Sequence, residues 1–214
     1  MADDLAGDLV RQVRDASTGA GSGRARLADA LRHLVAATVA PDFDDAAAVE
    51  LALRLEELGT GLDRPSSRQV AGARLASGAP DIRFATHPLV GAANAFAPPL
   101  RFEQTDGGVR ARATYGAPYE GLPGAVHGGV IASAFDGVLI FAAVAHGHPS
   151  VTGSLAVRFR RTAPLNSEIV YEASVVQVDR RKATVAGTLR DPDGEVCAEA
   201  EGVFVSVDRE RFGT

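Results

Sequence analysis

Residues 130–145 read VIASAFDGVLIFAAVA, the most apolar stretch of this 214-residue chain, and Asp136 is its only charged residue. Burying a carboxylate costs several kcal/mol unless the group is paired or hydrogen-bonded. Either Asp136 lies on a helix edge that reaches solvent, or it is held in a cleft for chemistry. The run is shorter than the ~18–20 residues that span a membrane. It therefore predicts a buried core helix over about 128–146.

Outside this helix, the C-terminal half of the chain alternates apolar and polar residues with a period of two, which indicates strands. Asp106-Gly107-Gly108 separates the first two segments and predicts a hairpin. A helix that is apolar nearly all round has to be covered on most sides, and an antiparallel sheet curled around it meets that requirement. The pattern predicts an α+β fold in which a sheet of about six strands wraps one central helix. The expected strands are 101–104, 109–114, 151–160, 168–178, 182–190 and 195–207.

The chain divides into three parts. A Gly/Ser-rich N-terminus, residues 1–25, is expected to be flexible. Apolar residues at helical spacing then predict a hairpin of two helices, the second capped by Asp44, within a helical extension over 26–78. The prolines of 62–99 predict an irregular stretch that wraps the main domain, and we place that domain at 79–208.

Composition limits the partners and the compartment. A formal net charge of −5 argues against a nucleic-acid binder, because phosphate neutralisation needs a basic face. The single cysteine, Cys197, excludes an intramolecular disulfide and is expected to serve packing in a strand. It fits a reducing cytoplasm, and the acidic N-terminus lacks the order of a secretory signal. No CxxC or HExxH spacing occurs, so we expect a cytoplasmic protein with no metal, no cofactor and no membrane partner.

His127-Gly128-Gly129 opens the apolar helix. Helices begin with free backbone N–H groups and the positive end of a dipole, which together favour an anion. Because Gly128 and Gly129 carry no side chain, a substrate oxygen is able to approach those N–H groups closely, as in an oxyanion hole. The alternative is that the two glycines only let a strand and the helix meet tightly.

The spacing between Gly128 and Asp136 bears on assembly. Eight residues at ~1.5 Å per residue place the two groups ~12 Å apart along one helix, so one carbonyl cannot touch both. If both act on one substrate, they come from two copies lying antiparallel across a two-fold axis. This predicts a homodimer with its sites at the interface; otherwise the protein is a monomer whose Asp136 faces water. Thr152, at the head of the next strand, either hydrogen-bonds a carboxylate or is an ordinary strand threonine.

The run from Tyr119 to Asp136, YEGLPGAVHGGVIASAFD, with Thr152 after it, resembles the PaaI-like group of hotdog-fold acyl-CoA thioesterases. That group belongs to the 4-hydroxybenzoyl-CoA thioesterase superfamily. The resemblance covers roughly residues 95–207, and the order of two strands, one helix and four strands matches the hotdog fold. It implies an enzyme that hydrolyses acyl-CoA thioesters to the free acid and CoA.

The resemblance also implies roles for single residues. Asp136 would act as the nucleophile or as the general base for water, with Thr152 assisting it. The Gly128 N–H would hold the thioester oxyanion, and His127 would help shape the helix entry. A thioester suits this arrangement because its carbonyl is electrophilic and its thiolate leaves readily, so that a carboxylate and one or two N–H donors suffice.

The coenzyme A phosphates of such a substrate favour arginines at the rim of the site. The main substrate-binding candidates are Gly129, Arg158, Arg160 and Arg181, and Arg161, Arg180 and Lys182 are further candidates for the phosphates. Strand-end arginines are also commonly a solvated face. The expected partner is an acyl-CoA, bound by a homodimer or by a homotetramer that pairs two dimers.

The sequence departs from the family at two places, and it leaves two alternative functions open. Gly121 and Pro123 occupy the region where many PaaI-like enzymes have an asparagine. Gly137 stands where the family often has an acidic residue, and we expect a looser or wider site there. One rival is a non-catalytic hotdog module that binds an acyl thioester, or a protein through its helical hairpin. The other is an acyl-thioester dehydratase, which needs an Asp-x4-His pattern, whereas Phe141 stands at the histidine position.

Overall fold

The structure is a computed structural model that describes residues 11–12, 14–15, 17–19, 22–62 and 85–206. Of the irregular stretch expected at 62–99, residues 63–84 lie outside the described part. The helices are α2 (Gly23–Thr38), α3 (Asp45–Gly59), the 3-10 turn η1 (Ala117–Tyr119) and α6 (Gly128–Ala145). The strands are β1 (Arg101–Thr105), β2 (Gly108–Thr114), β3 (Ser150–Phe159), β4 (Glu168–Asp179), β5 (Lys182–Arg190) and β6 (Val196–Ser206).

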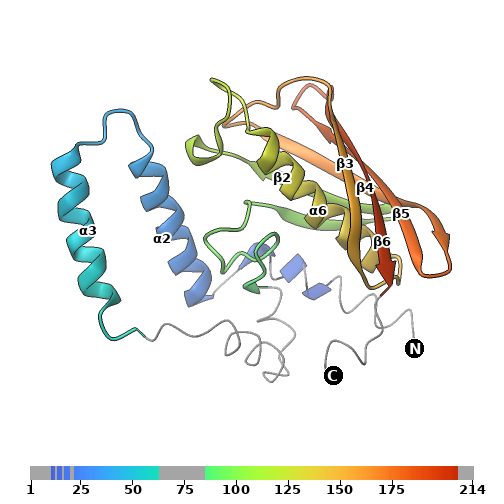
Figure 1. The fold of residues 1–214 in the computed structure, drawn as a ribbon, viewed down its shortest axis with the longest axis horizontal. Helices are drawn as coiled ribbons and strands as arrows, with labels where there is room; N and C mark the ends of the chain where they lie inside the picture. The colour runs from blue at the N-terminus through green and yellow to red at the C-terminus, as the bar shows by residue number, and fades with distance from the viewer. Residues whose placement is uncertain (1–10, 13, 16, 20–21, 63–84, 207–214) are drawn as a thin grey trace.

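The six strands form one sheet in the order β1-β2-β4-β5-β6-β3, and every neighbouring pair is antiparallel. Helix α6 contacts five of them, from β2 to β6, and Figure 1 shows it lying along the face of the curved sheet. The end of each strand and of the central helix lies within one residue of its expected position. The predicted hotdog fold is therefore confirmed.

Helix α6 is the centre of the core. It is long and apolar enough to cross a membrane by length and composition, and half of it is buried inside the fold, as a core helix covered by a sheet requires. The helix ends where His146 caps it and Gly147 turns the chain with a φ of 81°. Its buried residues are Ile131, Ala134, Phe135, Gly137, Val138, Leu139, Phe141, Ala142 and Ala143.

Two tyrosines are in contact under the helix, a feature that the sequence pattern does not predict. The hydroxyls of Tyr115 and Tyr171 lie 3.2 Å apart, and both side chains are fully buried. Phe135 of α6 packs edge-on against the Tyr171 ring at a centroid distance of 5.2 Å. Each hydroxyl has the other as its partner, so neither is left unsatisfied in the core. Burial raises the pKa of both tyrosines.

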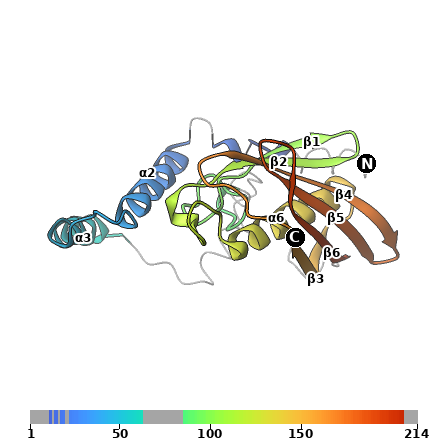
Figure 2. The ribbon, with the colours of Figure 1, turned by 90° about the horizontal axis from the view of Figure 1, so that it is seen from above.

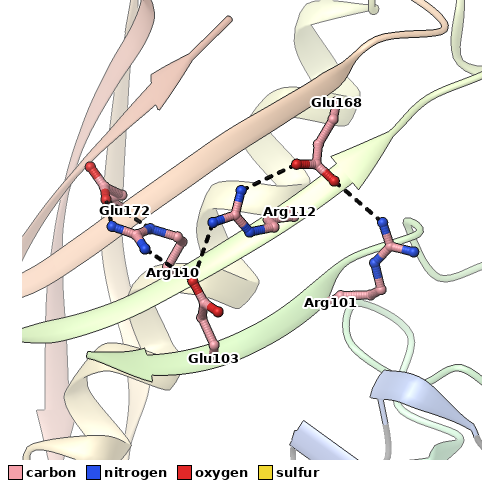
Figure 3. Close-up of polar contacts among 6 residues, drawn as sticks. All are labelled: Arg101, Glu103, Arg110, Arg112, Glu168 and Glu172. Carbon is pink, nitrogen blue, oxygen red and sulfur yellow. Dashed lines mark hydrogen bonds and ion pairs between the residues drawn. The ribbon is translucent and has the colours of Figure 1, made fainter. Parts of the chain in front are cut away.

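The outer face of β1, β2 and β4 carries an ion-pair network (Figure 3). Arg110 donates to Glu172 through Nε at 2.9 Å and through Nη2 at 2.6 Å, and to Glu103 at 3.1 Å. The like charges of Arg101 and Arg112 are direct cross-strand neighbours. Glu168 offsets their repulsion because it pairs with both. The charges on these strands thus pair with each other and support the strand register.

Helices α2 and α3 form the predicted hairpin, and Figure 2 shows them extending away from the sheet. The Asp44 carboxylate accepts the Ala47 N–H at 3.0 Å, as expected of an N-cap. Helix α2 is anchored by Arg32, which donates to the carbonyls of Ala92 at 3.3 Å and of Asn94 at 2.7 Å. Helix α3 buries no residue. The large apolar side chains that the pair exposes are Leu27, Leu31, Val35, Val49, Leu53, Leu55 and Leu58.

Residues 85–100, here called the strap, wrap the main domain as expected and bury Val90, Ala97 and Leu100. Of the N-terminus expected to be flexible, residues 1–10, 13, 16 and 20–21 lie outside the described part, but the described residues include a contact that was not expected. Ser17 is buried, and its hydroxyl accepts the N–H of Phe102 in β1 at 3.3 Å. Helix α2 already begins at Gly23, ahead of the boundary expected at residue 26. The Gly/Ser-rich composition did not predict this contact, because the contact depends on a single serine.

Candidate active site

His127 caps helix α6 with its own side chain. Its Nδ1 accepts the Gly129 N–H at 3.0 Å. The imidazole therefore shapes the helix entry, as expected. This bond also engages the Gly129 N–H, so Gly129 does not offer the free donor that we expected for substrate. The Gly128 N–H, by contrast, has no acceptor among the described residues.

The loop before the helix holds His127 in place. The His127 N–H donates to the Tyr119 carbonyl at 2.8 Å, and the Val126 N–H donates to the Ala163 carbonyl at 2.9 Å. Gly121 packs so closely on this residue that a Cβ there would lie 2.8 Å from the His127 Cα. Gly121 thus gives the backbone room to pass close to His127.

Asp136 and Thr152 are in direct contact. The Thr152 hydroxyl donates to Oδ1 of Asp136 at 2.7 Å. Asp136 is half-buried, so it neither lies in a fully dry core nor stands free in solvent. No other hydrogen bond to its carboxylate occurs among the described residues. Oδ2 therefore remains available for an attacking or proton-accepting role.

Strand β3 lies along the site as an edge strand. It pairs only with β6 in the described sheet. Its first half brings Thr152 to Asp136, and its last residue, Phe159, lies over the start of α6. A Cβ on Gly128 would lie 3.3 Å from the tip of the Phe159 ring. Gly128 thus leaves space beneath an aromatic side chain that is itself half exposed.

A pocket of about 650 Å³ opens at Gly128. Its lining includes the buried apolar residues Ala125, Val126, Ile131 and Ala163, the exposed Leu122 and Phe159, and Arg160 and Arg161. Asp136 does not line it. A larger hollow of about 770 Å³ lies across the outer face of the sheet, away from α6, and contains none of the predicted catalytic residues. The pocket at Gly128 is the one that fits the expected chemistry.

The structure separates the arginine candidates. Arg160 lines the pocket at Gly128, where its guanidinium pairs with Glu199 at 2.6 Å. Arg161 lines the same pocket, with Asp191 at 3.9 Å and Glu195 at 3.5 Å. Arg158 instead lines the hollow on the outer face. Arg181 donates to the Ser206 carbonyl at the end of β6. Arg160 and Arg161 are thus the two candidates that the fold places beside Gly128.

Gly137 does not open the site, contrary to expectation. It is buried under the strap, where its Cβ would meet the Leu89 Cβ at 3.3 Å and Val90 Cγ1 at 3.5 Å. The missing side chain thus gives space to the strap and not to substrate. Nothing in the sequence links Gly137 to a segment that lies almost fifty residues earlier, which explains the wrong expectation.

Cys197 is a buried packing residue, and its Sγ lies 3.5 Å from the Thr162 carbonyl. Burial raises the pKa of the thiol, which keeps it protonated and suits the packing role. Among the described residues, no cluster of three or more histidine, cysteine or acidic side chains is arranged to hold a metal ion.

Sequence reasoning did not single out Phe159 or Leu89. Phe159 does carry a signal, because it is the one apolar residue in Arg158-Phe-Arg-Arg161. An aromatic residue among strand-end arginines indicates a position that faces something other than solvent. The role of Leu89 had no comparable signal, since its contact with Gly137 depends on how the strap crosses the helix.

The sequence model of the Thioesterase superfamily matches residues 123–198, from the loop before α6 to the start of β6. Acyl-coenzyme A thioesterase THEM4 of Bos taurus is 32% identical over 101 residues, which is 46% of this chain and 41% of that protein. THEM4 of Mus musculus is 30% identical over 97 residues, 45% of this chain and 42% of that protein. The match thus spans about two fifths of the length of these curated relatives.

Solved structures extend the likeness. The crystal structure of protein RHA08564, a thioesterase superfamily protein, has a TM-score of 0.70 at 33% identity. It covers 87% of this chain and 92% of its own, so the match reaches beyond the hotdog domain into the N-terminal helices. Zebra fish thioesterase superfamily member 2 shares the fold, with a TM-score of 0.50 at 16% identity over 67% of this chain and 99% of its own. The chain belongs to the thioesterase superfamily.

Proposed function

We propose that this protein hydrolyses acyl-CoA thioesters to the free acid and CoA. The observation that carries the proposal is the Asp136 carboxylate held at 2.7 Å by the Thr152 hydroxyl on an otherwise apolar helix. That helix begins with the unengaged N–H of Gly128. The THEM4 relatives are named acyl-CoA thioesterases, which supports the same substrate class.

Asp136 is the group that starts the reaction. Thr152 holds Oδ1, which orients the carboxylate and leaves Oδ2 to attack the thioester carbonyl or to take a proton from water. Either route forms a tetrahedral oxyanion that expels the thiolate of CoA. Attack by water gives the free acid directly, whereas attack by the carboxylate leaves an acyl–aspartyl anhydride, which water then hydrolyses to the free acid. Nucleophilic and general-base routes use the same carboxylate, so the contact supports both.

The Gly128 N–H is the proposed oxyanion donor. It is the first residue of α6, where the helix dipole favours a developing negative charge. A donor of this kind contributes about 3–4 kcal/mol to transition-state stabilisation. Because the pocket at Gly128 excludes the Asp136 of its own chain, one copy supplies a donor and a pocket without the carboxylate.

Pairing of two β3 edges would supply the missing group. Strand β3 has no neighbour on its outer side in the described sheet. An antiparallel pair of two β3 strands brings the Thr152 end of one strand beside the Phe159 end of the other. Asp136 of one copy then faces Gly128 of the other, because Thr152 binds Asp136 and Phe159 covers Gly128. We therefore propose a homodimer with two shared sites, and a pair of such dimers as the possible higher assembly.

The pocket at Gly128 suits the two halves of the substrate. Its buried apolar lining accommodates an acyl or pantetheine chain. Arg160 and Arg161 stand at the same pocket and are the proposed partners of the CoA phosphates. Both already pair with acidic side chains, so phosphate binding would have to replace or share those contacts. The buried thiol of Cys197 fits the reducing cytoplasm in which we place the protein.

The second candidate is a hotdog module that binds an acyl thioester without hydrolysing it. It would use the same pocket but would not need the Thr152 hydroxyl that is bonded to Asp136. A panel of acyl-CoAs of varied chain length and aromaticity, read by released thiol, separates the two functions. Turnover that disappears in Asp136→Asn supports the enzyme, whereas tight binding without thiol release supports the module.

Mixing two inactive variants tests the shared site. Asp136→Asn removes the carboxylate, and Gly128→Pro removes the N–H at a helix position that tolerates proline. A hybrid dimer has one site with both groups intact and one with both defects. After subunit exchange at equal amounts, about a quarter of wild-type activity should return, since half the dimers are hybrids with one working site each. Verified exchange without recovery would rule out shared sites.

A further inference from the structure

The register of β3 contains an irregularity beside the catalytic threonine. Thr152 lies opposite Phe204 of β6, and Ser154 lies opposite the next residue, Val203. Gly153 is therefore an extra residue, and two residues of β3 oppose one of β6, which defines a β-bulge.

The bulge decides which way Thr152 faces. Directly opposed residues of an antiparallel pair share a face, and Phe204 is fully buried on the helix side. Leu155, opposite the buried Gly202, faces the same side. Thr152 and Leu155 are three residues apart, and regular alternation would put them on opposite faces. If all of these residues were paired regularly, without a bulge, Thr152 would lie opposite Val205 and point to the outer face, away from Asp136.

The position also requires a small residue. A Cβ on Gly153 would lie 3.1 Å from the Val203 carbonyl oxygen and 3.2 Å from Val205 Cγ2. A β-branched side chain adds further atoms to this contact and favours a regular strand. The glycine thus permits the bulge, and the bulge brings Thr152 to the carboxylate.

We propose that Gly153 is a positioning residue, which acts by placing the Thr152 hydroxyl on Asp136 through the β-bulge. The inference rests on the proposed function, since it concerns the same carboxylate. It predicts that activity depends more on the face of β3 on which Thr152 lies than on the glycine itself. Changes that keep Thr152 opposite Phe204 should preserve activity, and changes that shift the strand by one residue should not.

Four variants distinguish a change in the face on which Thr152 lies from a general disruption of the strand. Deleting Gly153 makes the strand regular while Thr152 stays opposite Phe204, so kcat should remain within about threefold of wild type. Gly153→Val keeps the residue count but disfavours the bulge, which turns Thr152 outward and Val151 inward. Its kcat should fall as far as that of Thr152→Val, roughly 10- to 100-fold, with KM little changed. Gly153→Thr is also β-branched, but in the regular strand residue 153 lies opposite Phe204, so its hydroxyl faces Asp136 and should recover at least ~10-fold of the kcat lost in Gly153→Val.

Ser154→Val is the matched control, because it adds a β-branched residue on the outward side of the same strand without filling the bulge. Its kcat should equal that of wild type. Melting temperature and dimer content are recorded for every variant, so that a change in kcat is read only from folded protein. If Gly153→Val does not fold, the deletion decides, because a folded deletion variant as inactive as Thr152→Val overturns the inference.

Other results also contradict it. Wild-type kcat in Gly153→Val, or a folded Gly153→Thr no better than Gly153→Val, would show that Gly153 does not position Thr152. If Thr152→Val turns over normally, Thr152 has no role to be positioned for, while the assignment of Asp136 stands. If the wild-type protein hydrolyses no acyl-CoA, the proposed function fails instead. In that case, a crystal structure of Gly153→Val tests whether Gly153 positions Thr152. A Thr152 hydroxyl that is still bonded to Asp136 in this variant would refute the inference.

Discussion

The Leu89 Cβ lies 3.3 Å from the position that a Cβ on Gly137 would take, so the strap covers α6 directly beside Asp136. We expect Gly137→Glu to destabilise the protein by at least ~3 kcal/mol, because it forces a charged side chain into a packed contact. Urea unfolding measures this loss. Gly137→Ala should change stability by less than ~1 kcal/mol, since helix propensity gained offsets the crowding.

Gly23→Glu is the control for this prediction. Gly23 is exposed in the first turn of α2, and a Cβ there meets nothing within 4 Å. An acidic residue near a helix N-terminus is favourable, so stability should not fall. Equal unfolding curves for Gly137→Glu and Gly23→Glu would show that the strap does not pack on the helix.

Asp136→Asn should lower kcat by at least ~100-fold, because an amide neither attacks a thioester nor accepts a proton from water. The melting temperature should stay within ~2 °C of wild type, since the amide oxygen still accepts the Thr152 hydroxyl. Steady-state assays and thermal unfolding on the same preparations check both parts. Near wild-type turnover in this variant would remove Asp136 from the mechanism.

The buried tyrosine pair predicts a loss of stability at alkaline pH. Burial raises the pKa of Tyr115 and Tyr171 in the folded protein. Their contribution is therefore fully present below the unfolded pKa of about 10. It is lost as pH rises above that value, because only the unfolded chain ionises there. Urea unfolding between pH 8 and pH 11 should show this decline, and Tyr115→Phe/Tyr171→Phe should reduce it.

The same pair makes a prediction at neutral pH. Either single phenylalanine variant leaves one buried hydroxyl without its partner, which costs about 1–3 kcal/mol. The double variant removes both hydroxyls and should be more stable than either single variant. A double variant that loses the sum of the two single effects would contradict the pairing.

The N-terminal residues should contribute to stability. Their composition alone predicts instead that a chain without residues 1–25 keeps the melting temperature and kcat of the full chain. A chain starting at Arg26 loses the Ser17 contact with the Phe102 N–H and the Ser22 cap of α2. We expect a loss of about 1–3 kcal/mol in unfolding free energy with kcat unchanged. Ser17→Ala should reproduce part of it, and the exposed Thr18→Ala should not. A full-length melting temperature in the shortened chain would restore the original expectation.

Helices α2 and α3 should contribute to stability or assembly. A chain starting at Ala79 loses the Arg32 contacts with the Ala92 and Asn94 carbonyls. It should melt lower, change its oligomeric state or aggregate, and light scattering with thermal unfolding would show which. The exposed apolar side chains of the hairpin form a surface that favours association. Arg32→Ala should lower the melting temperature more than the exposed Arg26→Ala. Identical behaviour of the short and full chains would make the hairpin a loosely tethered appendage.

The periodic part of this sequence predicts the fold well. The apolar run around Asp136 determines a covered helix, and the alternating segments determine strands, because both patterns are local and repeat every few residues. The hotdog arrangement follows from the order of these elements. The candidates Asp136, Gly128 and Thr152 were also found from sequence, through one charge in an apolar run and a resemblance to a family.

The geometry between those residues depends on contacts that no local pattern records. The Gly129 N–H is engaged by His127, and Arg158 lies on the outer face although Arg160, two residues later, lines the pocket. Each outcome is set by how neighbouring strands and loops pair. The strand register in particular contains a bulge, which alternation alone cannot reveal.

By itself, the sequence determined a sheet around one apolar helix and supplied the residues for the proposed thioester chemistry. Only the tertiary structure decided that Thr152 faces Asp136, that Leu89 covers Gly137 and that Ser17 reaches β1. Secondary structure depends on periodic burial along a short segment, which a sequence displays directly. These contacts join residues between 16 and 85 positions apart. Their free energy depends on packing that exists only once the chain has folded.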